Sequence, residues 1–491
     1  MKPNILLIHA DQHRYDCLGA YGNPDIKTPN IDGLAQDGVL FENSFCAHPV
    51  CTPSRYSLLT GLTIHQHLGL TNRSTLPPGV ATLPDQLRAN GYSTAAVGKM
   101  HFTPTYLDVG FDEMRLAEQH GEGRYDDDYH RWLASEGLCD RLDLMDQVAE
   151  FRRDAPKVYW DSFGALPSDL DEKHHSTTWI GDRAVELLDK WSHGSNFLMV
   201  GFIKPHHPFD PPAPWDAMYD PNELSILPGW TEGLIHGDDG RGHFSSRELT
   251  ESSLRRVMAL YYATISQIDH HVGRLINLLK AKGLYDNTIV IYTSDHGDYM
   301  GYHHRILKGY RMLEPLVRVP LIIKYPVDAR SRGRDERLVS NVDVAPALLS
   351  AAGLTPPQAM AGMNLLDQNA GPDFVFAETE SEYMVRSRTR KLLFHRDPGK
   401  SVFFDLEHDP LELENLIGRE DRWAEISAFR ERLLQWQLFD SRACNHLDLN
   451  ARQCSADNVP HEKAALYPYF KQAMMREAGQ AERRAAVETT A

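Results

Sequence analysis

Short apolar runs that alternate with amphipathic segments constrain the fold of this chain more than any other feature. The runs are rich in β-branched and aromatic side chains, as buried strands are. They cover residues 5–8, 94–97, 197–202, 288–292 and 321–325. The longest amphipathic segment, at 253–282, carries Leu, Val, Ile and Tyr residues on one helical face. Strands alternating with helices predict an α/β fold, in which a large, mostly parallel sheet lies between two layers of helices.

A different pattern follows the Gly-Pro-Asp sequence at 371–373. Four closely spaced apolar runs lie between residues 374 and 405, and one helical pattern comes next. This arrangement is typical of a small antiparallel sheet with a packed helix. We therefore expect a large α/β domain over 1–372, a small C-terminal subdomain over 373–443, and a tail over 444–491 that suits subunit contact in a homo-oligomer.

The charge and the cysteines bear on partners and compartment. The 491 residues include 51 basic and 68 acidic side chains, and the formal net charge of −17 opposes binding to nucleic acid or to anionic membranes. The first apolar run is too short for a signal peptide, and no stretch is long enough to span a bilayer. The six cysteines show no metal or disulfide spacing. We expect a cytoplasmic protein with reduced thiols.

Five groups of chemically reactive side chains stand out. Four follow predicted strands, and the fifth lies in the segment HPVCTPSRYSLLTG. Their members are Asp11, Cys51, Lys99, His101, His206, Asp295, His296 and Lys308. Because the carboxyl ends of parallel strands meet at one edge of a sheet, we expect these side chains to lie together. The carboxylates and imidazoles indicate a divalent cation, and the lysines indicate an anionic substrate.

Each of these residues alone has an ordinary structural explanation. An aspartate after a strand, such as Asp11, more often caps a helix or a turn. Cys51 alone is more often a small buried apolar residue. We expect ordinary loop roles for His207, His303 and His304. The placement of the whole set at one sheet edge is what favours a reactive site.

The segment Cys51-Thr52-Pro53-Ser54-Arg55, followed by YSLLTG, resembles the signature of the type I sulfatases of the alkaline phosphatase superfamily. Further motifs that resemble this family occur in order: ILLIHADQ, VGKMH, KPHHPFDPPAPW, SDHGD with a later lysine, and FFDLEHDPLELENL. In that family a formylglycine-generating maturation enzyme oxidises the signature cysteine to an aldehyde. The resemblance therefore implies that Cys51 is the precursor of formylglycine. A helix N-terminus at this position favours an anionic oxygen beside it.

The resemblance also implies a set of metal ligands. Asp11, Asp295 and His296 would bind one divalent ion together with the modified Cys51. Many sulfatases have an asparagine where His296 lies, so an imidazole joins the oxygen donors and Mn²⁺ is expected as well as Ca²⁺. Gln12 stands where many sulfatases have a second aspartate, and we expect it to contact the substrate.

The remaining roles implied by the resemblance concern the sulfate group. Lys99 and Lys308 would bind its oxygens, and Arg55 would hold the nucleophile. His206 would bind the substrate and protonate the leaving alcohol. His101 would help to expel sulfate from the covalent intermediate.

The predicted function is therefore that of an arylsulfatase-like sulfuric ester hydrolase acting on a sulfate monoester. Gln12 and His296 together also resemble the phosphonate monoester hydrolases and the choline sulfatases. Hydrolysis of phosphonate monoesters or phosphodiesters on the same scaffold is thus the alternative, although phosphonate monoester hydrolases generally lack the lysine–histidine pair of VGKMH. A non-catalytic protein that binds an anion or a metal is the alternative from another class. The alcohol of the ester stays open between aryl, choline and sugar.

Overall fold

An eight-stranded sheet forms the centre of the protein, with the strand order β4-β3-β5-β1-β6-β7-β2-β8. Its strands are β1 (Asn4–Ala10), β2 (Val39–Phe45), β3 (Ser93–Gly98), β4 (Glu113–Leu116), β5 (Asn196–Phe202), β6 (Thr288–Ser294), β7 (Leu321–Lys324) and β8 (Gly333–Ser340). Neighbouring strands are parallel except at β7, which is antiparallel to β6 and to β2. The computed structural model describes residues 2–119, 124–235, 242–327, 332–367, 371–441 and 466–475.

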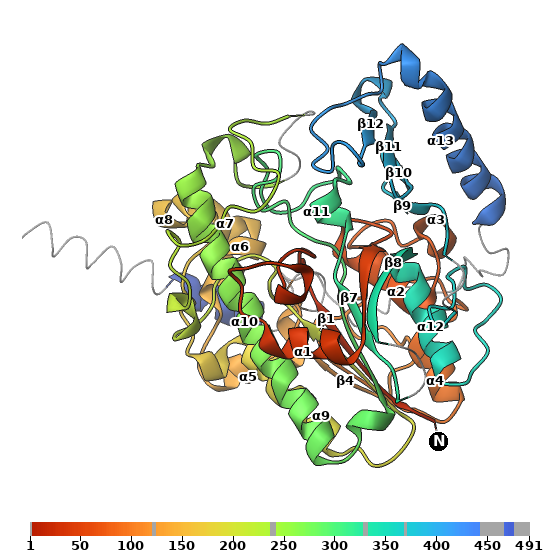
Figure 1. Ribbon diagram of the computed structural model, residues 1–491. Coiled ribbons are helices and arrows are strands. Elements are labelled where there is room, and N and C mark those ends of the chain that lie inside the picture. Colours follow the sequence, from red (N-terminus) through yellow and green to blue (C-terminus); the bar gives the residue numbers. More distant parts are fainter. Residues whose placement is uncertain are drawn as a thin grey trace, which may run out of the picture.

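Helices cover both faces of this sheet (Figure 1). One layer contains α1 (Pro29–Asp37), α9 (Ser176–Asp189) and α10 (Glu251–Ala281), and the other contains α2 (Cys51–Thr60), α4 (Leu83–Ala89) and α12 (Val344–Ala351). Side chains alternate along β1, so Leu6 and Ile8 pack in the first layer and Ile5 and Leu7 in the second. Because both faces of β1 are buried, its sequence is a continuous apolar run.

A second, antiparallel sheet has the strand order β12-β11-β10-β9. Its strands are β9 (Val375–Glu378), β10 (Glu382–Arg386), β11 (Arg390–His395) and β12 (Val402–Asp405). On one face, Val385 shares a core with Phe429 of α13 (Trp423–Gln435), and on the other, Met384 shares a core with Phe45 of β2. The predicted fold class is confirmed in both of its parts. The proposed domain limits at 372 and 443 stay predictions.

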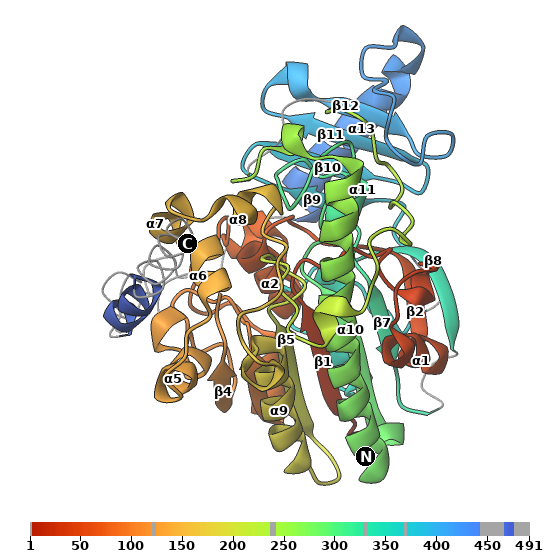
Figure 2. The ribbon, with the colours of Figure 1, turned by 90° about the vertical axis from the view of Figure 1, so that its left-hand side faces the viewer.

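Four short helices fill the connection between β4 and α9. They are α5 (Asp128–Ser135), α6 (Arg141–Gln147), α7 (Ala149–Arg153) and α8 (Lys157–Asp161). Two other short helices are α3 (Ile64–His67), which follows α2, and α11 (Glu314–Val317), between β6 and β7. Residues 466–475 pack on α6 and α7 of their own chain, where Tyr467 and Phe470 share a core with Leu144 (Figure 2). The rest of the predicted tail, 444–465 and 476–491, lies outside the described residues, and its role in subunit contact stays a prediction.

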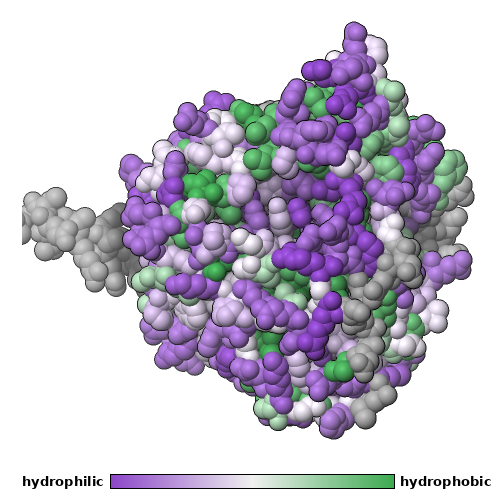
Figure 3. Space-filling model, viewed as in Figure 1, coloured by the Kyte–Doolittle hydropathy of each residue, from purple (hydrophilic) through white to green (hydrophobic). Residues whose placement is uncertain are grey.

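The surface and the interior differ as the sequence pattern requires. The face shown in Figure 3 is mostly hydrophilic, with scattered apolar patches. The predicted strand residues Ile5, Leu198 and Ile291 have no exposed area. Within the described ranges, no helix combines the length and the apolar composition needed to cross a membrane.

Candidate active site

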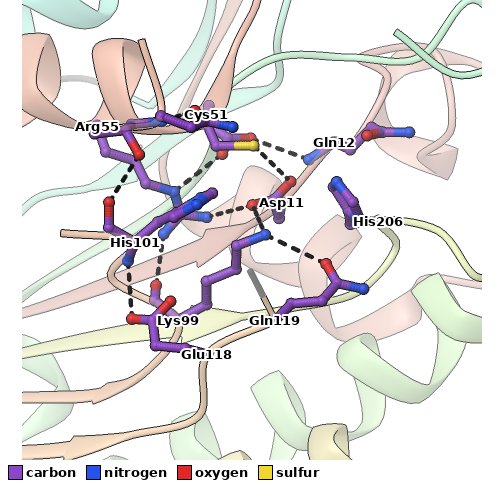
Figure 4. A network of polar contacts seen from close by, with 12 residues as sticks. Asp11, Gln12, Cys51, Arg55, Lys99, His101, Glu118, Gln119 and His206 are labelled. Atoms are coloured by element: carbon purple, nitrogen blue, oxygen red, sulfur yellow. Dashed lines mark hydrogen bonds and ion pairs between the residues drawn. The ribbon is translucent and has the colours of Figure 1, made fainter. Parts of the chain in front are cut away.

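Strand register brings the predicted residues to one edge of the large sheet. β1 pairs with β5 and with β6 so that Ala10 lies level with Phe202 and with Ser294. Asp11 and Asp295 directly follow two of these positions, so the two carboxylates meet at the carboxyl edge. The loops after β3 and β5 bring Lys99 and His206 to the same place (Figure 4). The expected convergence is observed.

Cys51 is the first residue of α2 and points into this edge. Its Sγ lies 3.0 Å from Nζ of Lys308 and 3.3 Å from Nε2 of His296. Asp11 Oδ1 lies 3.6 Å from the same sulfur. Burial, followed by the charge of Asp11, raises the pKa of the Cys51 thiol to about 11. The unmodified thiol is therefore protonated near neutral pH and a weak nucleophile.

Four buried residues form a group that fits a divalent cation. One potential ligand atom from each of Asp11, Cys51, Asp295 and His296 lies within 4.8 Å of the others. His296 donates from Nδ1 to the carbonyl oxygen of Gly297 at 2.9 Å, which leaves Nε2 directed at the group. Burial lowers the pKa of His296, so its imidazole is neutral, as a metal ligand must be.

Arg55 links the two carboxylates of this group. Its Nε donates to Asp295 at 3.0 Å. Its Nη2 donates to Asp11 at 2.9 Å (Figure 4). Its Nη1 donates to the carbonyl oxygen of Lys99 at 2.5 Å, and the side chain is fully buried. We expected Arg55 to hold the nucleophile itself. The observed contacts place it instead on the two carboxylates, which it orients.

Two lysines surround the same carboxylate and cysteine with positive charge. Lys99 Nζ lies 2.8 Å from Asp11 Oδ2. Burial alone would raise the pKa of the Asp11 carboxyl, but Lys99 and the other nearby positive charges hold it well below its usual range. Burial alone would lower the pKa of Lys308, but the nearby Cys51 and the charge of Asp11 raise it above its usual value. The acidic protein thus contains the locally basic pocket that an anionic substrate requires.

His206 is held in one defined tautomer. Its Nδ1 donates to the carbonyl oxygen of His207 at 2.7 Å, and its Nε2 lies 2.9 Å from Lys308 Nζ. Burial and the neighbouring charge of Lys308 lower the pKa of His206 well below its ordinary value. The imidazole is therefore neutral, and Nε2 accepts a hydrogen bond from Lys308.

His101 lies beside the site in a left-handed backbone conformation, with φ of 57°. Its carbonyl oxygen accepts from Thr52 Oγ1 at 2.8 Å, which ties it to the first turn of α2. The backbone N–H groups of Met100 and His101 both donate to Glu118 Oε1 at 2.9 Å. Burial raises the pKa of Glu118 to about 7.

Sequence reasoning missed three polar neighbours of the site: Gln119, Asp298 and Glu118. Gln119 Oε1 lies 3.4 Å from Lys99 Nζ. Asp298 accepts from Nε2 of Gln12 at 2.6 Å, so the amide nitrogen of Gln12 is already engaged. Glu118 and Gln119 follow β4, so recognition of that strand would have pointed to them. Its sequence EMRL is too short and too mixed to be recognised as a strand.

Comparisons with known proteins show the family of the chain. The family model described as Sulfatase matches residues 3–354, and the model described as N-sulphoglucosamine sulphohydrolase, C-terminal, matches residues 301–438. The arylsulfatase of Clostridium perfringens is 32% identical over 89% of this chain and 94% of its own length. The multifunctional alkaline phosphatase superfamily protein PehA of Trinickia caryophylli is 29% identical over 89% of this chain and 95% of its own.

Solved structures extend the comparison to the whole fold. The phosphonate monoester hydrolase of Agrobacterium radiobacter superposes with a TM-score of 0.73 and 26% identity, over 88% of this chain and 95% of that one. The chain therefore resembles an arylsulfatase in sequence and a phosphonate monoester hydrolase in fold. On the family match, the related sequences and the fold, this chain is an enzyme of the sulfatase family, within the alkaline phosphatase superfamily.

Proposed function

We propose that this protein hydrolyses a sulfate monoester by means of a formylglycine made from Cys51 and one divalent cation, Ca²⁺ or Mn²⁺. The surroundings of Cys51 carry the proposal, because Lys308 Nζ and His296 Nε2 lie 3.0 and 3.3 Å from its sulfur. A thiol with a pKa of about 11 does not suit nucleophilic attack at neutral pH. A hydroxyl group at this position would lie beside His296, one of the proposed cation ligands, and beside the ammonium group of Lys308.

When present, the cation and the hydrated formylglycine would together supply an oxygen nucleophile near neutral pH. The residues that would hold the cation are Asp11, Asp295 and His296. Arg55 supports this set by donating to both carboxylates. The donor set of two carboxylates and one neutral imidazole suits Mn²⁺ as well as Ca²⁺.

The two lysines would act on the sulfate group. Lys99 and Lys308 would bind its oxygens and stabilise the charge that develops in the transition state. His206 would take up a proton at Nε2 when the anionic substrate binds and pass it to the leaving alcohol, while Lys308, 2.9 Å away, keeps its charge. His101 would act as the base that accompanies release of sulfate, held in place by Glu118 and Thr52.

Phosphonate monoester or phosphodiester hydrolysis is the second candidate. His296 and the likeness to the phosphonate monoester hydrolase of Agrobacterium radiobacter favour it. Lys99→Ala separates the two, because the lysine–histidine pair of VGKMH resembles sulfatases and is generally lacking in phosphonate monoester hydrolases, and Lys99 lies 2.8 Å from Asp11 in the site. We expect kcat/KM for sulfate esters to collapse in this variant. A variant that keeps sulfate turnover and loses phosphonate turnover would reverse the assignment.

The experiment that tests the proposal is peptide mass spectrometry of the segment around Cys51. The protein would be produced together with a formylglycine-generating enzyme and assayed on aryl, choline and sugar sulfates. We expect a mass change that matches conversion of thiol to aldehyde at Cys51, while Cys139 stays a thiol. An intact, alkylatable Cys51 in protein that turns over sulfate esters would refute the proposed nucleophile. Full conversion and stoichiometric metal binding without turnover of any ester would support a non-catalytic binding protein.

A further inference from the structure

Asp146, His207 and His243 form a second group of metal-ligating side chains that the proposed mechanism does not use. One potential ligand atom from each lies within 4.8 Å of the other two. His207 Nδ1 lies 2.5 Å from Asp146 Oδ2, and His243 Nε2 lies 3.3 Å from Asp146 Oδ1. His207, for which an ordinary loop role was expected, has its side chain engaged by a fully buried carboxylate at the end of α6.

We propose that Asp146, His207 and His243 bind a second metal ion, of the zinc class, beside the active site. Two imidazole nitrogens and one carboxylate oxygen are a donor set typical of Zn²⁺, whereas Ca²⁺ and Mg²⁺ prefer oxygen donors. Three protein ligands would leave a fourth position for water. The side chains of His207 and His243 are 10% and 18% exposed, so solvent has access to the group from their side.

Neighbouring residues already hold the carboxylate in a ligand orientation. Tyr159 Oη donates to Asp146 Oδ1 at 2.8 Å, and Gln147 Nε2 donates to Asp146 Oδ2 at 2.5 Å. Gln119 Nε2 donates to the carbonyl oxygen of His207 at 2.7 Å and fixes the backbone of that residue. Such outer contacts are what orient metal ligands in established sites.

The distances show what must change when a metal enters. Two ligands at about 2.0 Å from a tetrahedral zinc lie about 3.3 Å apart. The distance between Asp146 Oδ1 and His243 Nε2 already has this length, whereas the hydrogen bond between Asp146 Oδ2 and His207 Nδ1, 2.5 Å long, must break so that Nδ1 can face the metal. The proton that His207 Nδ1 shares with Asp146 would shift to Nε2 of the same ring, so the imidazole stays neutral. Tyr159 and Gln147 would keep their hydrogen bonds to the carboxylate.

This group is separate from the first one but adjacent to it. The rings of His206 and His207 are stacked, with centroids 4.2 Å apart and an interplanar angle of 25°. No residue is common to the two groups. The first has three protein side chains other than Cys51, two of them carboxylates, and the second is richer in nitrogen. The two groups should therefore differ in the ion they select.

The test is metal titration of the full-length protein. A chelator removes bound metal, Ca²⁺ is added in excess for the first group, and Zn²⁺ is then titrated by calorimetry, with Co²⁺ as a spectroscopic substitute. We expect one equivalent of Zn²⁺ to bind beyond the Ca²⁺ and Co²⁺ to give the visible absorption of a tetrahedral site. His243→Gln should weaken this binding at least tenfold. His408→Gln should leave it unchanged, because His408 is exposed and lies in a different group, with Asp405 and Glu407.

Two results would overturn the inference. One is Zn²⁺ binding that is equally tight in His243→Gln, and the other is no binding beyond the Ca²⁺. In either case the group is a hydrogen-bonded clamp around Asp146. X-ray absorption of the zinc-loaded wild type gives a readout that needs no variant: we expect nitrogen and oxygen neighbours, and sulfur neighbours would contradict the site. Occupancy is measured without turnover, so an inactive enzyme with an intact zinc site would count against the proposed function alone.

Discussion

Nζ of Lys308 lies 3.0 Å from Sγ of Cys51, at the first residue of α2. The ammonium group therefore stands where charge would develop on a substrate bound to residue 51. The same Nζ lies 2.9 Å from His206 Nε2, so Lys308 contacts both residue 51 and the side chain proposed to protonate the leaving alcohol. The following predictions rest on this arrangement and on the contacts around it.

Replacement of Lys308 by alanine should lower kcat for sulfate esters by about 10²–10³-fold, because one preorganised positive group is lost. Steady-state kinetics with a single sulfate ester measures the change. The matched control is Lys157→Ala, since Lys157 is exposed and its ammonium group pairs with Asp161 of the same helix. A Lys308 variant with the kcat of the wild type would exclude a role for this residue in the chemical step.

Replacement of Cys51 by serine should lower turnover by roughly 10³-fold or more, because serine has no second hydroxyl on the reacting carbon. We expect a stalled covalent adduct, visible by intact-protein mass spectrometry after incubation with substrate. Cys139→Ala serves as the control and should retain turnover, because Cys139 packs in a separate apolar core near α6. Sustained turnover by Cys51→Ser would mean that residue 51 is not the nucleophile.

Replacement of Arg55 by lysine should weaken binding of the catalytic cation by about 10–100-fold, because a lysine cannot donate to Asp11 and Asp295 with a planar fork. Calorimetric titration of chelator-treated protein with Ca²⁺ and with Mn²⁺ measures the affinity. Arg88→Lys, at an exposed ion pair with Asp85, should leave it unchanged. If Arg55→Lys bound the cation with unaltered affinity, Arg55 would not be needed to orient the metal ligands.

Replacement of His296 by asparagine should shift the metal preference towards Ca²⁺ by about 10-fold relative to Mn²⁺, because an oxygen donor replaces the imidazole nitrogen. The ratio of the two dissociation constants, wild type against variant, is the quantity to measure. An unchanged ratio would show that Nε2 of His296 is not a ligand, although it lies 3.3 Å from Cys51 Sγ.

The free energy of unfolding should fall as the pH rises through the titration of Glu118. Burial raises its pKa from 4.5 to about 7, so the folded protein holds a proton that the unfolded chain loses. This contribution, about 3 kcal/mol, is complete below pH 4.5 and is lost as the pH passes 7. Urea unfolding of the wild type and of Glu118→Gln across this range should therefore show a difference in free energy that declines with pH. A constant difference would contradict the raised pKa.

Local sequence determined the centre of the fold and the identity of most site residues. β1, β5 and β6 are buried on both faces, so their apolar runs stand out without any tertiary information. Asp11 and Asp295 could be placed at the carboxyl edge because each directly follows such a run. The long helix α10 was visible for the same reason, as its one apolar face repeats with the helical period.

Tertiary structure alone decided the strands and contacts that local pattern does not encode. β2, β4 and β8 carry mixed polar and apolar residues, because parts of them reach the surface, and they were not recognised. The direction of Arg55 towards two carboxylates depends on which strands pair, and the contact between Asp146 and His207 joins residues 61 positions apart. Sequence periodicity records how deeply a side chain is buried. It does not record which distant side chain lies opposite, since that follows only when the whole sheet and its loops have packed.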